Sequence, residues 1–273
     1  MPTITTNGVQ IFYRREGQGE PVLLVHGYMF GGDYWRPQID ALKSDYEVID
    51  VDLRGQGRSE TTTDLADYDL WNQVEDLYGV IEQLGIGPVH WVGLSMGGFI
   101  GMRMALRHPE VIRDLVLIDT TDLPEAEDKK EIYAAFRQVS RDGGLATVAA
   151  ALPTTFFKQS CIDGESEKVK AWIDGCLAAN AEGLLLASEA IDLRDDISDR
   201  TPSINLPTLV IHGTEDVAVP PERGEALAGR IPGARLEWIE GAGHQSNVDT
   251  PDEVSRLLQG FLAERRQTAG STG

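Results

Sequence analysis

The chain has 273 residues, 41% of them hydrophobic and 25% charged, which is ordinary for a globular protein and long enough for one large core. Its 24 Lys and Arg residues against 44 Asp and Glu residues give a formal charge of −20, a balance that disfavours nucleic acid and anionic membrane as partners. No apolar run reaches the roughly 18 residues of a transmembrane helix, and residues 1–8 lack the features of a signal peptide. We therefore expect a cytoplasmic protein that contacts neither nucleic acid nor membrane.

Cysteines and histidines give no sign of a metal site. Two cysteines, Cys161 and Cys176, are too few for a disulfide framework, and we expect both to pack as small hydrophobic residues. The five histidines show none of the paired spacings that are typical of zinc ligands. The prediction is a protein without metal or cofactor.

Short apolar runs alternate with helical stretches through residues 1–121. Residues 9–14 alternate in polarity and predict an antiparallel edge strand. Residues 21–25 are continuously apolar, as in a strand that is buried on both faces of a parallel sheet. Further strands are expected at residues 46–51, 89–94 and 114–118. Asp69 is a plausible N-cap for one of the intervening helices. The alternation predicts a parallel sheet covered on both faces.

This alternation stops between residues 121 and 201. The segment contains apolar stretches with helical character, and no strand is expected among them. These stretches are residues 132–139, 145–152, 169–177 and 184–191. The sheet then resumes at residues 206–211 and 235–239. We predict a core formed by residues 1–121 and 201–273, with a helical cap inserted at residues 122–200.

Ser95 lies where a predicted strand turns sharply into a predicted helix, with Gly93 and Gly97 two residues to either side. Such a turn holds the serine in a strained conformation with its hydroxyl projecting above the sheet edge. Glycines are needed at these two positions because side chains there would collide with the neighbouring strand or the helix. The helix also directs its free N–H groups toward the serine. The pattern predicts that Ser95 is a nucleophile.

A serine hydroxyl needs a base to remove its proton, and the base needs an acid that fixes its tautomer. His244 lies in a glycine-framed loop after the last predicted strand, and Asp216 follows the strand before it. The chain order Ser95, Asp216, His244 fits a serine triad. Asp119, which ends the strand at residues 114–118, is an alternative acid that the sequence leaves open.

Five motifs in this order resemble those of the α/β-hydrolase superfamily, and most closely its small bacterial esterases, lactonases and cofactor-free haloperoxidases. The motifs are His26-Gly27, the Asp52-x-Arg54-Gly55-x-Gly57-x-Ser59 loop, residues 93–98, residues 212–220 and Gly243-His244. The resemblance implies an eight-stranded, mostly parallel twisted sheet with helices on both faces and a helical cap over the site. It also implies that no cofactor is needed.

The resemblance assigns a role to each candidate residue. Ser95 would attack a carbonyl carbon, His244 would take and return the proton, and Asp216 would stabilise the imidazolium. The backbone N–H groups of Met96 and Tyr28 would form the oxyanion hole, with Met29 as an alternative to Tyr28. A serine at the elbow favours acyl transfer to water over the dehalogenation and epoxide opening that related enzymes perform with an aspartate.

The substrate is less clearly indicated than the reaction. Apolar residues that flank the site or belong to the cap are candidates for a substrate pocket, although the cap aromatics could equally be core. The candidates are Phe30, Phe99, Val217, Phe156 and Trp172. Without a nearby cluster of Arg or Lys, a small to medium neutral carboxylic ester or lactone fits best. Alternatives are C–C bond hydrolysis of enol-diketones, haloperoxidase-like perhydrolysis, and a small-molecule receptor with a vestigial triad. A homo-oligomer remains possible.

Overall fold

The computed structural model describes residues 2–149, 151–164 and 167–270. In them an eight-stranded sheet has the order β1-β2-β4-β3-β5-β6-β7-β8. β2 pairs antiparallel with β1 and β4, and all other neighbouring strands are parallel. The predicted fold, an eight-stranded and mostly parallel sheet, is confirmed. The strands are β1 (Thr3–Thr6), β2 (Val9–Gly17), β3 (Glu20–Val25), β4 (Tyr46–Val51), β5 (Val89–Leu94), β6 (Ile112–Ile118), β7 (Thr208–Gly213) and β8 (Arg235–Ile239).

The edge of the sheet differs from the prediction. We expected β2 to be the edge strand, but β1 pairs with its outer side and takes that position. β1 has four residues, three of them threonine, and only Thr6 is buried. A strand this short and polar carries too little alternation to be recognised, although short polar edges are a common protection against aggregation.

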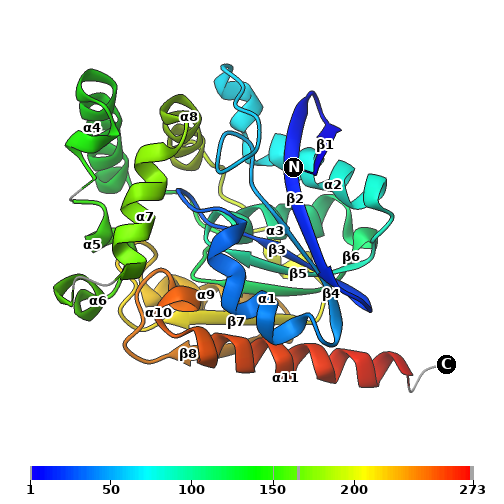
Figure 1. The fold of residues 1–273 in the computed structure, drawn as a ribbon. Helices are drawn as coiled ribbons and strands as arrows, with labels where there is room; N and C mark the ends of the chain where they lie inside the picture. The colour runs from blue at the N-terminus through cyan, green and yellow to red at the C-terminus, as the bar shows by residue number, and fades with distance from the viewer. Residues whose placement is uncertain (1, 150, 165–166, 271–273) are drawn as a thin grey trace.

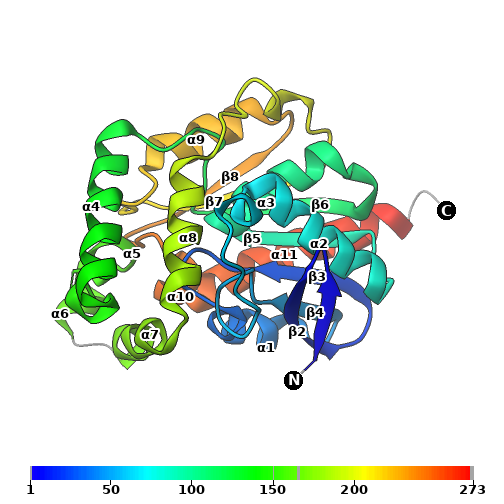
Figure 2. The same ribbon diagram turned by 90° about the horizontal axis from the view of Figure 1, so that it is seen from above.

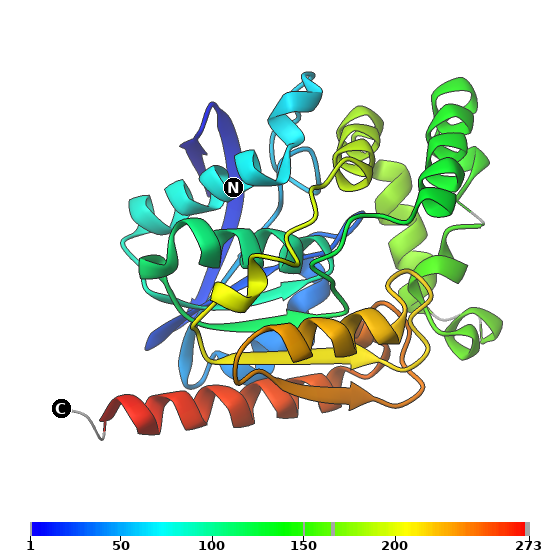
Figure 3. The same cartoon turned by 180° about the vertical axis from the view of Figure 1, so that it is seen from behind.

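Helices cover both faces of the sheet (Figure 1). α1 (Arg36–Leu42) and α11 (Pro251–Gly270) pack on one face, where their apolar side chains meet those of β3, β5, β6 and β7. α2 (Leu70–Leu84), α3 (Met96–Arg107) and α9 (Pro221–Arg230) pack on the other face. Figure 3 shows α11, in red, on the opposite side of the sheet from α2 and α3. These two layers bury the sheet as the apolar runs predicted.

The start of α2 follows the predicted capping chemistry. The Asp69 side chain accepts a hydrogen bond from the N–H of Trp71 at 2.8 Å, which satisfies a donor that the helix itself cannot. Four apolar residues spaced along one face are buried against the sheet. They are Leu70, Val74, Leu77 and Ile81.

Five helices between β6 and β7 gather at one end of the sheet (Figure 2). They are α4 (Glu127–Gly143), α5 (Pro153–Phe156), α6 (Gln159–Asp163), α7 (Glu167–Ala178) and α8 (Ala181–Asp192). All of them lie within the predicted insertion. The helix expected at residues 145–152 is wrong, because the described residues of that range, 145–149 and 151–152, form only a 3-10 turn at Leu145–Thr147. This turn follows Gly144, with φ 81°, and α5 begins at Pro153.

A layer of aromatic and apolar side chains joins these cap helices to the core. Phe30 of the core meets Phe156, Phe157 and Trp172 of the cap, with ring centroids between 5.7 and 6.2 Å from its own. Cys176 is buried in the same layer, and the thiol is free. Among the described residues, no helix is both long enough and apolar enough to cross a bilayer.

Candidate active site

Ser95 occupies the turn between β5 and α3 with φ 48° and ψ −109°. This left-handed conformation is strained for a residue with a side chain and persists only where the surroundings hold it. Two hydrogen bonds fix the turn to the strand beside it. The Ser95 N–H donates to the Ile118 carbonyl at 2.8 Å, and the Thr120 hydroxyl donates to the Ser95 carbonyl at 2.8 Å.

Gly93 and Gly97 are required by close backbone approach, as predicted. A Cβ atom on Gly97 would lie 2.1 Å from the carbonyl oxygen of Val25 in the neighbouring strand β3. A Cβ atom on Gly93 would lie 2.3 Å from the carbonyl oxygen of Gly97. Both separations are far inside van der Waals contact, so any larger residue would displace the turn that presents Ser95.

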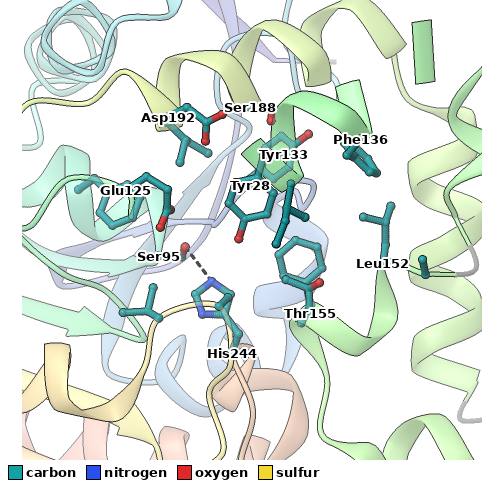
Figure 4. Close-up of a pocket in the computed structure, with 17 residues that line it drawn as sticks. Tyr28, Ser95, Glu125, Tyr133, Phe136, Leu152, Thr155, Ser188, Asp192 and His244 are labelled. Atoms are coloured by element: carbon teal, nitrogen blue, oxygen red, sulfur yellow. Dashed lines mark hydrogen bonds between the residues drawn. The ribbon is translucent and has the colours of Figure 1, made fainter. Parts of the chain in front are cut away.

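The three predicted triad residues form a hydrogen-bonded chain. Ser95 Oγ lies 2.9 Å from His244 Nε2 (Figure 4). On the other side of the imidazole ring, His244 Nδ1 lies 2.8 Å from Asp216 Oδ2. The side chains come from three different strand ends, after β5, β7 and β8. The residues are only 7%, 3% and 3% exposed, so water scarcely screens their interactions. The distances suit proton transfer from the hydroxyl to the imidazole.

Two backbone N–H groups fix the orientation of the Asp216 carboxylate. Its second oxygen, Oδ1, accepts hydrogen bonds from the N–H groups of Ala218 and Val219, both at 2.9 Å. Burial acts to raise the pKa of Asp216, but His244 and His212 outweigh it and hold that pKa below its usual value. The carboxylate therefore stays charged, with Oδ2 directed at the imidazole.

Asp119, the alternative acid, is engaged elsewhere. Its Oδ1 accepts from the N–H of Gly213 at 2.9 Å, and its Oδ2 accepts from the N–H and hydroxyl of Ser246 at 3.0 and 2.6 Å. Burial, and then the charge of Asp216, raises the pKa of Asp119. The geometry thus favours Asp216 over Asp119 as the partner of His244.

In the described part of the chain, one set of side chains has the composition of a metal site, namely Asp119, His212 and Asp216, whose ligand atoms lie within 4.8 Å of one another. His212 Nε2 already lies 2.9 Å from the carbonyl of Val219 and 3.4 Å from Asp216. Burial acts to lower the pKa of His212, but the two aspartates outweigh it and raise that pKa. Protein groups thus engage both carboxylates and His212 Nε2, while His212 Nδ1 has no hydrogen-bond partner among the described residues.

The loop after β3 approaches Ser95 from the other side. A Cβ atom on Gly27 would lie 2.9 Å from Leu94 Cδ2 and 3.3 Å from the Cβ atom of Ser95, so the loop passes in tight contact with the elbow. His26 braces the loop through Nδ1, 2.7 Å from the Gly27 carbonyl, and through Nε2, which accepts from the N–H of Leu53 at 2.9 Å. Burial lowers the pKa of His26, which keeps this acceptor neutral. These contacts give His26 a structural role in the loop.

A cavity of about 250 Å³ opens beside Ser95 and His244. Two of the predicted substrate-binding residues, Phe99 and Phe156, line it, and the Phe156 ring centroid lies 6.0 Å from that of His244. The described residues that line it are Tyr28, Ser95, Phe99, Glu125, Ile132, Tyr133, Phe136, Ala151, Leu152, Thr155, Phe156, Ser188, Ile191, Asp192, Ala218, Val219 and His244. No Arg or Lys is among these described residues.

Three predicted substrate-binding residues do not line the cavity. Phe30 and Trp172 are buried in the layer that joins cap and core, where the Trp172 indole donates to the Met29 carbonyl at 3.1 Å. Val217 is 59% exposed, while the next two residues of its loop face the cavity. Proximity in sequence does not determine which way a side chain points, and a role of these three residues in substrate binding stays a prediction.

Comparison with known proteins agrees with this geometry. Residues 20–157 match the family model described as the alpha/beta hydrolase fold, and residues 191–271 match a second model, described as TAP-like protein. The chain belongs to the α/β-hydrolase family. The hydrolase match spans half of the chain and includes both the elbow and the loop after β3.

Similar proteins in this family have several activities. The enol-lactonase from Burkholderia xenovorans is 29% identical, with a TM-score of 0.90 over 96% of this chain and 100% of that one. A thermophilic esterase from Thermogutta terrifontis is also 29% identical, with a TM-score of 0.89 over 97% of this chain and 98% of its own. A Synechocystis sp. protein provisionally named a non-heme chloroperoxidase is 32% identical over 93% of this chain and 95% of its own length.

Most cavity residues of this α/β-hydrolase come from cap positions that the sequence analysis did not single out. α4 contributes Ile132 and Phe136, and α8 contributes Ser188 and Asp192. In each pair the residues are four apart, which places them on one face of their helix. This spacing was a usable signal, but the sequence alone did not show which helical face would cover the site.

Proposed function

We propose that this α/β-hydrolase cleaves small to medium neutral carboxylic esters or lactones through an acyl-enzyme formed on Ser95. The observation that carries the proposal is the buried chain of hydrogen bonds from Ser95 through His244 to Asp216. Acyl transfer needs an activated nucleophile. A serine hydroxyl presented by a strained turn is activated by an imidazole whose orientation a fixed carboxylate holds.

In the first half of the reaction, Ser95 Oγ attacks the carbonyl carbon while His244 Nε2 takes its proton. The tetrahedral intermediate collapses when His244 returns that proton to the leaving alcohol, which leaves an ester on Ser95. Water, deprotonated by His244, then attacks this ester, and His244 returns the proton to Ser95 Oγ as the carboxylic acid leaves. Asp216 stabilises the imidazolium in both halves, since its charge lies 2.8 Å from Nδ1.

The oxyanion of the intermediate would be bound by the N–H groups of Met96 and Tyr28. Met96 is the first residue of α3, so its N–H has no acceptor in a preceding helical turn. Met29 is the weaker candidate for the second donor, because its N–H already donates to Gln56 Oε1 at 2.8 Å. No described residue accepts from the N–H of Tyr28, which supports Tyr28 over Met29.

The cavity supports the substrate class. Its lining is largely apolar, and its volume of about 250 Å³ is at the small end of ligand cavities. A substrate bearing a carboxylate would find no lysine or arginine among the described lining residues and would face Glu125 and Asp192 instead. The substrates of enol-diketone hydrolysis usually carry carboxylates, so the charge of this lining disfavours that alternative. Perhydrolysis would share the same acyl-enzyme, so it remains a possible side activity.

The test is hydrolysis of p-nitrophenyl esters from acetate to decanoate by the wild type and by Ser95→Ala. We expect an initial burst of p-nitrophenol, a best substrate between butyrate and hexanoate, and a loss of roughly 10⁴-fold or more in Ser95→Ala. Ser203→Ala, a change of an exposed serine away from the cavity, is the matched control and should keep wild-type rates. An active Ser95→Ala would refute the proposal.

A further inference from the structure

Three polar side chains in the largely apolar cavity lie beside one another. Tyr28, Ser188 and Asp192, together called the polar wall, all line it. In Figure 4, Ser188 and Asp192 reach the cavity from α8, while Ser95 and His244 reach it from the core. The proposed mechanism uses none of these three side chains. A buried polar group without a role in folding or catalysis points to a ligand.

Asp192 has one occupied and one free oxygen. Its Oδ2 accepts from Arg137 Nη1 at 2.5 Å, and the same guanidinium nitrogen donates to Ser188 Oγ at 3.0 Å. Asp192 Oδ1 is buried and has no hydrogen-bond partner among the described residues, although Asp192 is only 4% exposed. The ion pair holds the carboxylate in place while the free oxygen remains an acceptor.

Glu125, in contrast to Asp192, has no free carboxylate oxygen. It is the other carboxylate that lines the cavity, but its Oε2 accepts from Arg194 at 3.1 Å and its Oε1 from the N–H of Ala126 at 3.0 Å. Both oxygens of Glu125 are thus satisfied by the protein. Of the two described carboxylates that line the cavity, only Asp192 has an oxygen without a hydrogen-bond partner.

The Tyr28 hydroxyl is the second unused group. It is buried beside Ser188, whose hydroxyl is close enough to act on the pKa of Tyr28, but it makes no hydrogen bond of normal geometry to any residue in the described ranges. Burial raises the pKa of Tyr28, so the phenol stays protonated and can both donate and accept. The polar wall therefore presents an acceptor at Asp192 and a donor-acceptor at Tyr28.

We infer that the polar wall binds a neutral hydrogen-bond donor, a hydroxyl or an amide N–H, carried by the part of the substrate that does not react. The inference rests on the proposed function and narrows its substrate class to esters or lactones that carry such a group. The donor would bind Asp192 Oδ1, and its own oxygen could accept from the Tyr28 hydroxyl.

The charges around the polar wall favour a neutral group over an ion. A carboxylate would be repelled by Asp192 and Glu125, whose arginine partners do not line the cavity. An ammonium group would approach a carboxylate whose charge Arg137 already balances, so it would lose its hydration for little gain. A hydroxyl or amide needs only the free lone pair, and it supplies that hydrogen bond without a second buried charge.

The test compares p-nitrophenyl 6-hydroxyhexanoate with the isosteric heptanoate and with 6-methoxyhexanoate, which can only accept. The same end groups are placed on the alcohol side of acetate esters, and chain lengths of four to eight carbons are covered. If the polar wall binds a donor, the hydroxyl compound should exceed the methyl compound in kcat/KM by about tenfold or more in one series. If the polar wall does not bind a donor, the hydroxyl is buried without a partner, and the hydroxyl compound has the lower kcat/KM. Which of the two compounds has the higher kcat/KM therefore decides between the two outcomes.

Asp192→Asn tests whether Asp192 is responsible. Arg137 should keep the amide oxygen on its own side, which turns the NH₂ group toward the cavity and replaces an acceptor with a donor. The ratio of hydroxyl to methoxy kcat/KM should then fall by about tenfold. Glu189→Gln is the matched control, since Glu189 also lies on α8 and pairs with an arginine of α4, Arg141, at 3.2 Å, but does not line the cavity. It should keep the wild-type ratio.

The outcomes separate this inference from the proposed function. Turnover of alkyl esters with a methyl preference in both series, or an unchanged ratio in Asp192→Asn, overturns the polar wall and leaves the esterase proposal standing. If the wild type cleaves no ester, the proposed function fails. Calorimetric titration of Ser95→Ala with the same hydroxyl and methyl compounds then decides the inference, because tighter binding of the hydroxyl compound is still required.

Discussion

Replacing Asp216 by Asn should abolish most activity through the tautomer of His244. The Oδ1 position of Asp216 is held by two backbone donors, the N–H groups of Ala218 and Val219 at 2.9 Å. The amide oxygen of an asparagine must take that position, so its NH₂ group is directed at His244 Nδ1, 2.8 Å from the present Oδ2. Two donors cannot face each other, so His244 must accept at Nδ1 and carry its proton on Nε2. In that tautomer it cannot accept the proton of Ser95.

The expected loss in kcat for Asp216→Asn is about 10⁴-fold, equivalent to about 5 kcal/mol of transition-state stabilisation. Asp119→Asn is the matched control, because it makes the same chemical change in a neighbouring buried aspartate that has no hydrogen bond to His244. We expect it to cost less than tenfold in kcat. Both would be assayed on p-nitrophenyl butyrate, with thermal unfolding as the check on folding. Activity of Asp216→Asn within tenfold of the wild type, or equal losses in the two variants, would refute the reasoning.

Three further predictions concern the supports of the site. Gly97→Ala should lower the free energy of urea unfolding by about 1–3 kcal/mol, because its Cβ would lie 2.1 Å from a β3 carbonyl; Gly229→Ala, with open space around it, should not. Gln56→Leu leaves the Met29 N–H buried and unpaired, which should lower the free energy of unfolding by about 1–3 kcal/mol. The same change should lower kcat more than it raises KM, and an unchanged kcat would contradict the proposed loop geometry. Burial, followed by the charge of the neighbouring aspartate, raises the pKa of Asp119 to about 6. The native state therefore holds a proton that the unfolded state has lost, and stability should fall as pH rises from the usual carboxyl range toward that value. Asp119→Asn should flatten the dependence of the unfolding free energy on pH, measured by urea unfolding at several pH values. An unchanged slope would count against the raised pKa of Asp119.

The elbow and the triad could be predicted because local chemistry determines them. A serine in a left-handed turn requires glycine wherever another backbone comes close, and Gly93 and Gly97 meet carbonyl oxygens at 2.3 and 2.1 Å. The acid and base follow from strand order, since parallel strands end at the same edge of the sheet. The competition between Asp119 and Asp216 could not be settled from sequence, because both residues follow strands that end at that edge.

The substrate cavity was predicted less well, for a physical reason. Its walls are formed by cap helices, and which face of such a helix covers the site depends on packing between segments far apart in the chain. Trp172 and Phe30 were expected at the cavity and are instead buried in the layer between cap and core. Asp192 and Ser188 were not expected at all, because a polar residue on a helix is ordinarily solvated.

The central claim is that Ser95 carries the acyl group, and rapid acid quenching of the reaction followed by mass spectrometry tests it most directly. The wild type would be mixed with p-nitrophenyl butyrate, quenched during the burst and digested. The account predicts a mass increase of one butyryl group on the peptide that contains Ser95, and none in Ser95→Ala. A burst with the label on any other residue, or turnover without a labelled peptide under conditions where deacylation limits the rate, would contradict it.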